Sequence, residues 1–197
     1  MNLFARIVFM GVMTSLILIA GNTKPVRAEQ KRICSVSSAD LTNISYSIFD
    51  QSIDSPYSWR CIAERGEFKL AQELVDQYIA TNKAKLDVYE IQNLFFHSGQ
   101  LAAIDGRYKD AISNFSQAID HEDTTGDFLS WNEYVYGTIF FLEGNIEKLK
   151  QEIEKIKARN IEFDSPNLQI LNNFLMCPNE TYRSIYSQTS SCLNSHH

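Results

Sequence analysis

The sequence lacks the short motifs that mark most catalytic centres. It has no His-Glu-x-x-His metal motif, no Cys-x-x-Cys pair, no glycine-rich phosphate loop and no Gly-x-Ser-x-Gly nucleophile elbow. Its 197 residues include only four histidines, His97, His121, His196 and His197. These absences argue against an enzyme, and we expect neither a cofactor nor a bound metal.

Two arrangements of titratable residues are candidate sites. The run Asp120-His121-Glu122-Asp123 is acidic like a calcium loop, but Gly126 comes one place too late for an EF-hand and no glutamate closes the loop. A solvated loop is the favoured interpretation. His97 with Glu90 offers a base and an orienting carboxylate, but such a pair on one helix is too common to indicate a site.

The N-terminal segment, residues 1–28, has the layout of a secretory signal peptide. Arg6 precedes an uncharged, mostly apolar run from Ile7 to Gly21, and Val26-Arg27-Ala28 offers a small-residue cleavage site before Glu29. A transmembrane helix needs about 20 apolar residues, so the run is short for a span. An uncleaved anchor is the alternative, and only then would the protein contact a membrane.

The mature chain is poor in basic residues. The whole sequence has 18 basic and 24 acidic residues, a net charge of −6. Cleavage after Ala28 removes Arg6, Lys24 and Arg27 but no acidic residue, so the mature chain is more acidic still. Nucleic acids and anionic membranes both require a basic patch, so neither is an expected partner. The length of the mature chain, residues 29–197, fits one domain of ordinary size.

The most regular stretch runs from Leu94 to Ile119 and predicts two helices joined at Asp105-Gly106. In its second half, apolar residues recur with the i, i+3, i+4, i+7 spacing of a helix with one buried stripe. Gly106 stands where the first helix should stop, in a position suited to the left-handed cap conformation. Small residues in both halves, such as Gly99, would allow the two helices to approach closely.

This hairpin resembles a tetratricopeptide (TPR) repeat. The positions that match the family pattern are Gly99, Gly106, Tyr108, Ala111, Phe115 and Ala118. The positions that depart from it are Phe95, Ser98, Ala102 and Asp123, where the family prefers tryptophan, leucine, tyrosine and proline. A single such unit cannot bury its apolar face alone, so the resemblance implies neighbouring repeats.

Two further units are predicted when residues are compared by their offset from a turn glycine. Gly66 and Gly144 are followed by apolar residues at the same offsets as Gly106. The spacing between successive glycines of this set exceeds the TPR period of about 34 residues. We therefore expect an all-α fold, a TPR-like stack of about three helix-turn-helix units over residues 55–158. An ordinary helical bundle with one TPR-like hairpin is the alternative.

Flanking helices should cap the stack. Residues 29–54 form an N-terminal segment whose capping helix is predicted over Ser37–Ser52, with a stripe of Leu41, Ile44 and Ile48. Ser55-Pro56 should start the first repeat helix, and Asp127 should cap the third unit's first helix, which ends at Leu142. Residues 159–197 hold C-terminal capping helices, starting at Ser165-Pro166, and a loose polar tail from Ser190.

All four cysteines, Cys34, Cys61, Cys177 and Cys192, lie in the mature chain. Export permits disulfides, and proximity in the sequence favours Cys34–Cys61 and Cys177–Cys192. Four cysteines allow three pairings, and free buried cysteines are the other alternative. The expected location is the periplasm of a bacterium or the outside of a cell.

The resemblance also implies a binding surface, because the first helices of TPR units line a groove. That face comprises a set rich in aromatic residues: Asn93, Phe96, His97, Gln100, Trp131, Tyr134, Thr138 and Phe141. Tryptophan and tyrosine are frequent interface anchors. Packing of Trp131, Tyr134 and Phe141 under the C-terminal helices is the competing interpretation.

These observations lead to an exported TPR-like adaptor or scaffold that binds a protein or peptide partner through the aromatic groove. A periplasmic inhibitor, such as an immunity protein against a toxin, is the first alternative. A small enzyme of unknown reaction is the second, and only scattered glutamate, histidine and tyrosine residues favour it. The sequence does not identify the partner.

Overall fold

The computed structural model describes residues 33–121 and 129–194, and within these ranges the protein is all-α, with no strand. Two short irregular helices occur, the π-helix η1 (Ser47–Gln51) and the 3-10 helix η2 (Glu162–Asp164). The α-helices are α2 (Trp59–Ala63), α3 (Phe68–Asn82), α4 (Val88–Ile104), α5 (Tyr108–Gln117), α6 (Trp131–Leu142), α7 (Ile146–Arg159), α8 (Ser165–Met176), α9 (Tyr182–Tyr186) and α10 (Ser191–Asn194). No helix in the described part is long and apolar enough to cross a bilayer.

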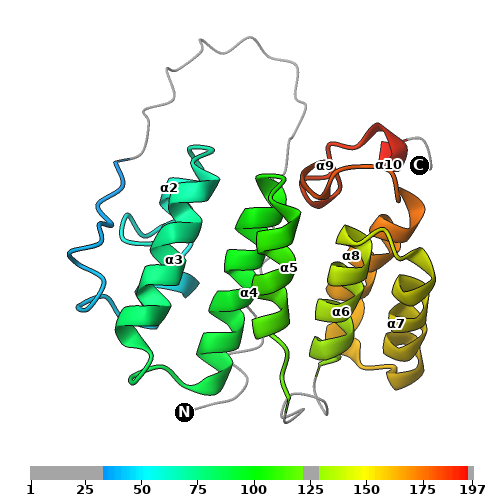
Figure 1. The fold of residues 1–197 in the computed structure, drawn as a ribbon, viewed down its shortest axis with the longest axis horizontal. Helices are drawn as coiled ribbons and strands as arrows, with labels where there is room; N and C mark the ends of the chain where they lie inside the picture. The colour runs from blue at the N-terminus through cyan, green and yellow to red at the C-terminus, as the bar shows by residue number, and fades with distance from the viewer. Residues whose placement is uncertain (1–32, 122–128, 195–197) are drawn as a thin grey trace.

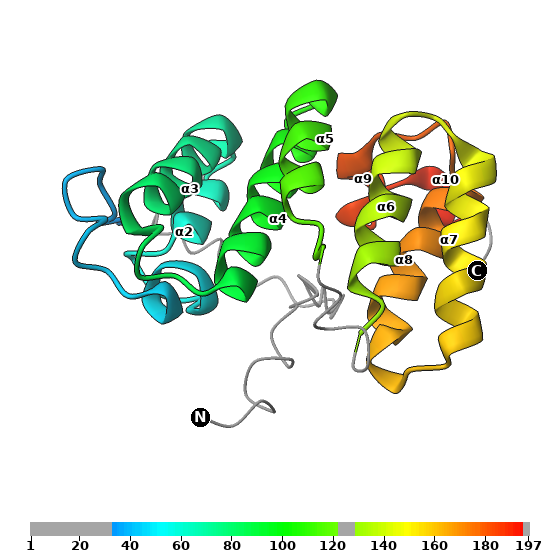
Figure 2. The ribbon, with the colours of Figure 1, turned by 60° about the horizontal axis from the view of Figure 1, so that its bottom comes forward.

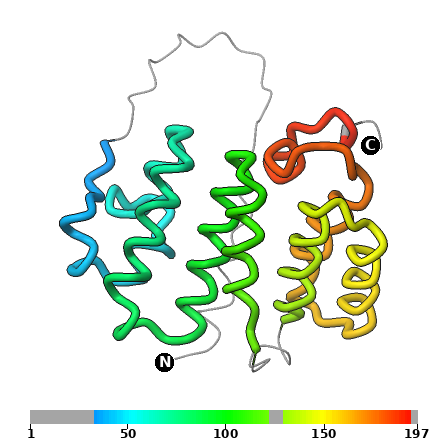
Figure 3. Tube along the Cα trace, in the orientation of Figure 1, coloured from blue at the N-terminus to red at the C-terminus, as the bar shows by residue number. Residues whose placement is uncertain are grey.

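The helices pack in the order of the chain. From α2 to α8 each helix contacts the next one, so that α2–α3, α4–α5 and α6–α7 lie side by side across the molecule (Figure 1). The tube view follows the same path and shows the chain turning back after α8 (Figure 3). That return brings α9 onto both α8 and α4 (Figure 2). The C-terminal helices therefore cover part of the central pair.

Three glycines make the turns inside the helix pairs. Gly66, Gly106 and Gly144 have φ angles of 79°, 78° and 70°, the left-handed region that suits glycine. At the end of α4, the amides of Gly106 and Arg107 donate to the carbonyls of Ala103 (3.1 Å) and Ala102 (2.9 Å). This pair of bonds is a Schellman cap, which satisfies carbonyls left free by the ending helix. The predicted left-handed cap at Gly106 is confirmed.

Glycine also sets the distance between α4 and α5. A Cβ atom added to Gly99 would lie 2.7 Å from Cδ1 of Phe115, so only glycine leaves room for that ring. Gly137 on α6 does the same for Leu171, at 2.8 Å, but its partner lies on α8 and not on α7. The predicted close approach within the central hairpin is therefore confirmed.

Two apolar clusters form the core. One joins η1, α2, α3 and the near side of α4, and its fully buried side chains include Phe49, Tyr78 and Leu94. The other extends from α4 to α10 and includes Phe96, Phe115 and Phe174. Phe95 packs against both clusters. Helix α4 thus supplies side chains to the entire core, on two of its faces.

Both predicted disulfides are present. Cys34 and Cys61 pair with a Cα–Cα distance of 5.7 Å, and Cys177 and Cys192 pair at 6.0 Å. The first bond fixes the N-terminal segment to α2, and the second fixes α10 to the end of α8. Two disulfides are consistent with an exported protein.

The N-terminal capping helix was predicted wrongly. Residues 38–43 form turns, and within Ser37–Ser52 only Tyr46 and the adjoining η1 are helical. Ile48 of the predicted stripe is exposed, whereas the adjacent Phe49 is buried and its ring stacks on Tyr78 at 4.0 Å. The Ser37 hydroxyl donates to the Asp40 carboxylate at 2.6 Å, a bond between two side chains. Serine and asparagine, which are frequent in this segment, are residues whose side chains can compete for backbone groups and so favour turns over a helix.

Helix ends were predicted with mixed success. α2 starts at Trp59 with Ser58 as its cap, and not at Ser55-Pro56. α4, α6 and α8 begin or end close to the predicted residues, although the proposed cap Asp127 lies outside the described residues and Ser130 precedes α6. The tail is not loose throughout, because α10 forms where Cys192 is tied to Cys177.

Candidate functional site

The eight residues of the predicted groove are all buried, none being more than 8% exposed. They lie on α4 and α6, on faces that the chain itself covers with η1, α8 and α9. The face is therefore not an open groove in the free protein. This corrects the expectation of an exposed aromatic surface, while the binding of a partner there stays a prediction.

The aromatic members of this set belong to the core. The ring of Phe96 lies 5.0 Å from that of Trp131 and 5.4 Å from that of Tyr134, and the ring of Phe141 stacks on Phe174 of α8 at 4.2 Å. Phe141 therefore packs under a C-terminal helix, as the competing interpretation predicted. Two buried polar groups are satisfied locally: Trp131 Nε1 donates to the carbonyl of Ala118, and Thr138 Oγ1 to that of Tyr134.

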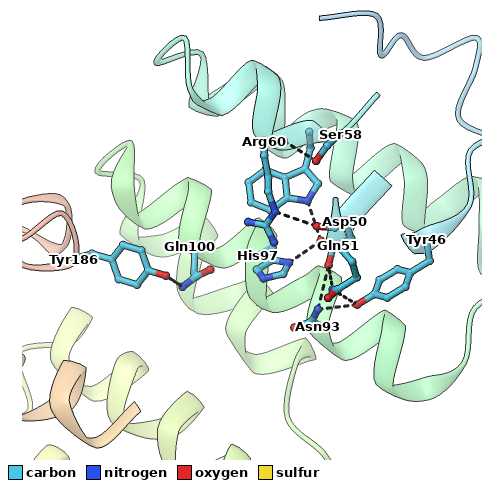
Figure 4. Close-up of polar contacts among 10 residues, drawn as sticks. Tyr46, Asp50, Gln51, Ser58, Arg60, Asn93, His97, Gln100 and Tyr186 are labelled. Atoms are coloured by element: carbon cyan, nitrogen blue, oxygen red, sulfur yellow. Dashed lines mark hydrogen bonds and ion pairs between the residues drawn. The ribbon is translucent and has the colours of Figure 1, made fainter. Parts of the chain in front are cut away.

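The polar members form a ladder along α4. Asn93, His97 and Gln100 follow one another at helical spacing, and each binds a segment of the chain that lies far away in sequence (Figure 4). Asn93 and His97 contact the η1 region, and Gln100 contacts α9. The ladder explains why η1 and α9, both only one turn long, stay on α4.

Asp50 of η1 is the centre of this network. Its Oδ1 atom lies 2.7 Å from Nδ1 of His97 and accepts a hydrogen bond of 2.8 Å from Nε1 of Trp59. Its Oδ2 atom accepts from Nδ2 of Asn93 at 3.2 Å and also from Gln51. A fully buried carboxylate is stable only when its oxygens are bonded in this way.

Arg60 and Tyr46 complete the network on either side. Arg60 donates from Nε to the main-chain oxygen of Asp50 at 3.0 Å, and its guanidinium lies 4.2 Å above the ring of Trp59. The Tyr46 hydroxyl accepts from Asn93 at 2.7 Å and from Gln51 at 3.0 Å. Side chains from η1, α2 and α4 are thereby joined around one carboxylate.

The electrostatics favour an ionised Asp50. Burial alone would raise the pKa of its carboxyl group, but the charge and hydrogen bond of His97, the charge of Arg60 and the bond from Trp59 together hold the pKa well below its ordinary 3.8. Burial and the negative charge of Asp50 raise the pKa of the Tyr46 hydroxyl well above 10.0, so this group stays protonated.

The Asp50–His97 pair has the geometry by which a carboxylate orients an imidazole in hydrolases. A nucleophile would then have to bond to Nε2, and no described residue makes a hydrogen bond to that atom. Glu90, considered above as the orienting carboxylate, instead accepts from the amide of Asp87 in the capping box of α4. The pair as it stands orients His97 and closes the network.

The C-terminal end of the ladder is built from tyrosines. Gln100 Nε2 donates to the Tyr186 hydroxyl at 3.0 Å, and the rings of Tyr182 and Tyr186 stack with their centroids 5.4 Å apart. Burial raises the pKa of the Tyr182 hydroxyl well above 10.0. Neither tyrosine was singled out from the sequence as a site residue, because α9 returns to α4 from far along the chain.

No metal centre is evident among the described residues, since nowhere in 33–121 and 129–194 do three histidine, cysteine or acidic side chains converge. Asp120 of the acidic run is buried, and its main chain exchanges two 2.8 Å hydrogen bonds with the side chain of Asn132. The rest of that loop, residues 122–128, lies outside the described residues.

A cleft of about 520 Å³ lies elsewhere, between the end of α7 and the start of α8. Ile156, Ile161 and Leu168 line it together with polar groups such as Lys157 and Glu162. Asp164 at its edge is buried and caps α6, because its two oxygens accept from the amide and the hydroxyl of Ser130 at 2.7 and 2.6 Å. This carboxylate is thus fully engaged in holding two helix ends together.

Comparisons of the chain with protein-family models, with curated proteins and with solved structures return no match. The site is therefore interpreted from its own geometry. Two features matter for function: a face of α4 that η1 and α9 cover, and polar atoms at the edge of this cover that make no hydrogen bond within the described part of the chain.

Proposed function

We propose that the protein is an exported, TPR-like protein–protein interaction module that acts as an adaptor or scaffold. The observation that carries the proposal is the repetition of one device, a helix pair closed by a left-handed glycine, at Gly66, Gly106 and Gly144. Stacked helix pairs of this kind commonly present extended binding surfaces. A signal-like N-terminus and two disulfides support the export of the module.

The partner would bind on the side formed by η1, α2, α4 and α9. The buried groove residues cannot make the first contact, because η1, α8 and α9 cover them. Side chains that reach the surface on this side include the half-buried Arg60 and Tyr186. Replacing Trp131 or Tyr134 would disturb the core, so those substitutions do not test binding.

The test is the capture of a partner by the mature protein, residues 29–197, from the envelope fraction of its own host. One protein should be retained at a fixed stoichiometry, should be identified by mass spectrometry and should bind again when both components are purified. Its identity would separate an adaptor from a toxin inhibitor. A folded bait that retains no such protein would refute the proposed function.

A further inference from the structure

Arg60 has hydrogen-bond donors that the described part of the chain does not use. Its Nε atom donates to the main-chain oxygen of Asp50, and its guanidinium covers the ring of Trp59, which fixes the side chain in place. Neither Nη atom makes a hydrogen bond to any residue in the described part of the protein. Because the arginine side chain is already held by its Nε atom and by ring stacking, little further side-chain entropy is lost when these remaining donors bind a ligand.

The carboxylate group of Asp50 makes no hydrogen bond with Arg60. Asp50 receives hydrogen bonds from Trp59, Asn93 and His97, whereas Arg60 reaches only its main-chain oxygen. The Oδ1 atom of Asp50 contacts Nδ1 of His97 at 2.7 Å. The positive charge of Arg60 is therefore not matched by a direct contact with this carboxylate.

Tyr186 supplies another unused donor. Its hydroxyl oxygen accepts from Gln100, and its own proton is not donated to any described residue. Burial raises the pKa of this hydroxyl, while the bond from Gln100 and the charge of Arg60 lower it, so the guanidinium acts electrostatically at Tyr186. Figure 4 shows Tyr186 and Gln100 on one side of His97, with Asp50 and Asn93 on the other and Arg60 above it.

His97 lies between these groups. Its ring is 5.3 Å from that of Trp59, and Asp50 holds Nδ1, so that Nε2 is left without a partner among the described residues. Three elements, α2, α4 and α9, thus each bring one unsatisfied polar group to the same region. The unpaired donors among these groups, on Arg60 and Tyr186, indicate a place for a ligand with acceptor oxygens.

We propose that Arg60 and Tyr186 form a carboxylate-binding site beside His97, between α2, α9 and α4. The planar fork of Nη1 and Nη2 matches the two oxygens of a carboxylate, and the Tyr186 hydroxyl adds a donor from the opposite side. The carboxylate belongs to an acidic residue or chain terminus of a protein, or to a small organic acid. The assignment to a protein carboxylate rests on the proposed function. The existence of the site does not depend on that function.

The first experiment titrates the folded mature protein with N-acetylglycine and, separately, with N-acetylglycinamide, which lacks the charge. NMR signals of the Arg60 side chain should shift on titration with the acid only. Arg60→Gln should weaken binding at least tenfold and Tyr186→Phe several-fold. Arg159→Gln is the matched control. Arg159 of α7 pairs with Glu133 of α6, and this variant should bind the acid as tightly as the wild type does.

Equal shifts with the acid and the amide, or unchanged binding by Arg60→Gln, would overturn the site. Circular dichroism and melting temperature report whether each variant is folded. Should Arg60→Gln fail to fold, Arg60→Lys and Tyr186→Phe provide the test. Arg60→Lys keeps the charge and Tyr186→Phe keeps the ring, but both variants lose hydrogen bonds to the ligand. Wild-type affinity in both of these variants would also refute the proposal.

The second experiment repeats the capture of a partner with Arg60→Gln and Arg159→Gln as baits. Loss of the partner with the first bait alone would assign the carboxylate to that protein. Equal capture by both baits, with acetylglycine binding intact in the wild type, would assign it to a small organic acid. Binding of acetylglycine without any captured protein would refute the proposed function and leave the site established.

Discussion

Nδ1 of His97 and Oδ1 of Asp50 lie 2.7 Å apart and join α4 to a π-helix that comes much earlier in the chain. Both side chains are almost completely shielded from solvent, and Trp59 and Asn93 donate to the same carboxylate. The N-terminal segment is therefore held on the stack by a satisfied buried charge as well as by Phe49 and by the Cys34–Cys61 bond.

Replacing this carboxylate by an amide should destabilise the protein strongly. Asp50→Asn keeps the shape but removes the charge, and it leaves His97, Trp59 and Asn93 with a poorer acceptor. We expect the free energy of unfolding in urea to fall by about 3 kcal/mol, as when one partner of a buried pair is removed. Asp110→Asn removes an exposed carboxylate that pairs with Arg107, and should change it by less than about 1 kcal/mol. Similar losses in the two variants would contradict the role of Asp50.

The contribution of Asp50 should depend on pH. Its pKa is lowered in the folded protein, so the unfolded chain takes up a proton first as the pH falls. The difference in unfolding free energy between wild type and Asp50→Asn should be complete above the ordinary pKa of 3.8 and should shrink progressively below it. Urea titrations at a series of pH values on both sides of that ordinary pKa measure it. A difference that grows towards low pH would have the wrong sign.

The contact of Gly99 with Phe115 gives a prediction about packing. A methyl group on residue 99 would meet the ring at 2.7 Å, so Gly99→Ala should cost about 1–3 kcal/mol through overpacking. Combining it with Phe115→Leu, which withdraws the ring, should cost less than the sum of the two single changes. A double-mutant cycle measures this coupling, and additivity within about 0.5 kcal/mol would show that the two residues do not constrain each other.

Much of the central fold follows from local patterns in the sequence. Gly106 ends α4 and Tyr108 opens α5 because the cap and the apolar stripe are encoded within a few residues. The disulfide pairs follow from proximity in the same way. The segment before α2 was misjudged because its serines, asparagine and Pro56 favour turns, a preference that outweighed the spacing of Leu41, Ile44 and Ile48.

The polar contacts of the candidate site could not be predicted from local sequence patterns. His97 and Gln100 were placed on the correct helix, but their partners Asp50 and Tyr186 lie far from them in the sequence, one before and one after α4. No periodicity links such positions. The aromatic residues of α6 were read as a surface because a repeat leaves that face open, whereas here α8 packs on it through Phe174. The added C-terminal helices, not the repeat pattern, decide which face is buried.

The two disulfides should stabilise different parts of the protein. Each closes a short loop, with sequence separations of 27 and 15 between the paired cysteines. Each should contribute about 3 kcal/mol. Cys177→Ser with Cys192→Ser should speed amide exchange in α9 and α10 and leave residues 33–36 unchanged. Cys34→Ser with Cys61→Ser should do the reverse. Exchange that rises uniformly in both variants would show that neither bond acts locally.

The most direct test of the account is a hydrogen-exchange footprint of the complex with the captured partner. The proposed binding surface lies beside the segments that cover α4, so amides of η1, α2 and α9 should exchange more slowly in the complex. Helices α3, α5 and α7, the second members of the three pairs, should exchange as in the free protein. Protection confined to α3, α5 and α7 would contradict it, because the partner would then bind the opposite side of the molecule.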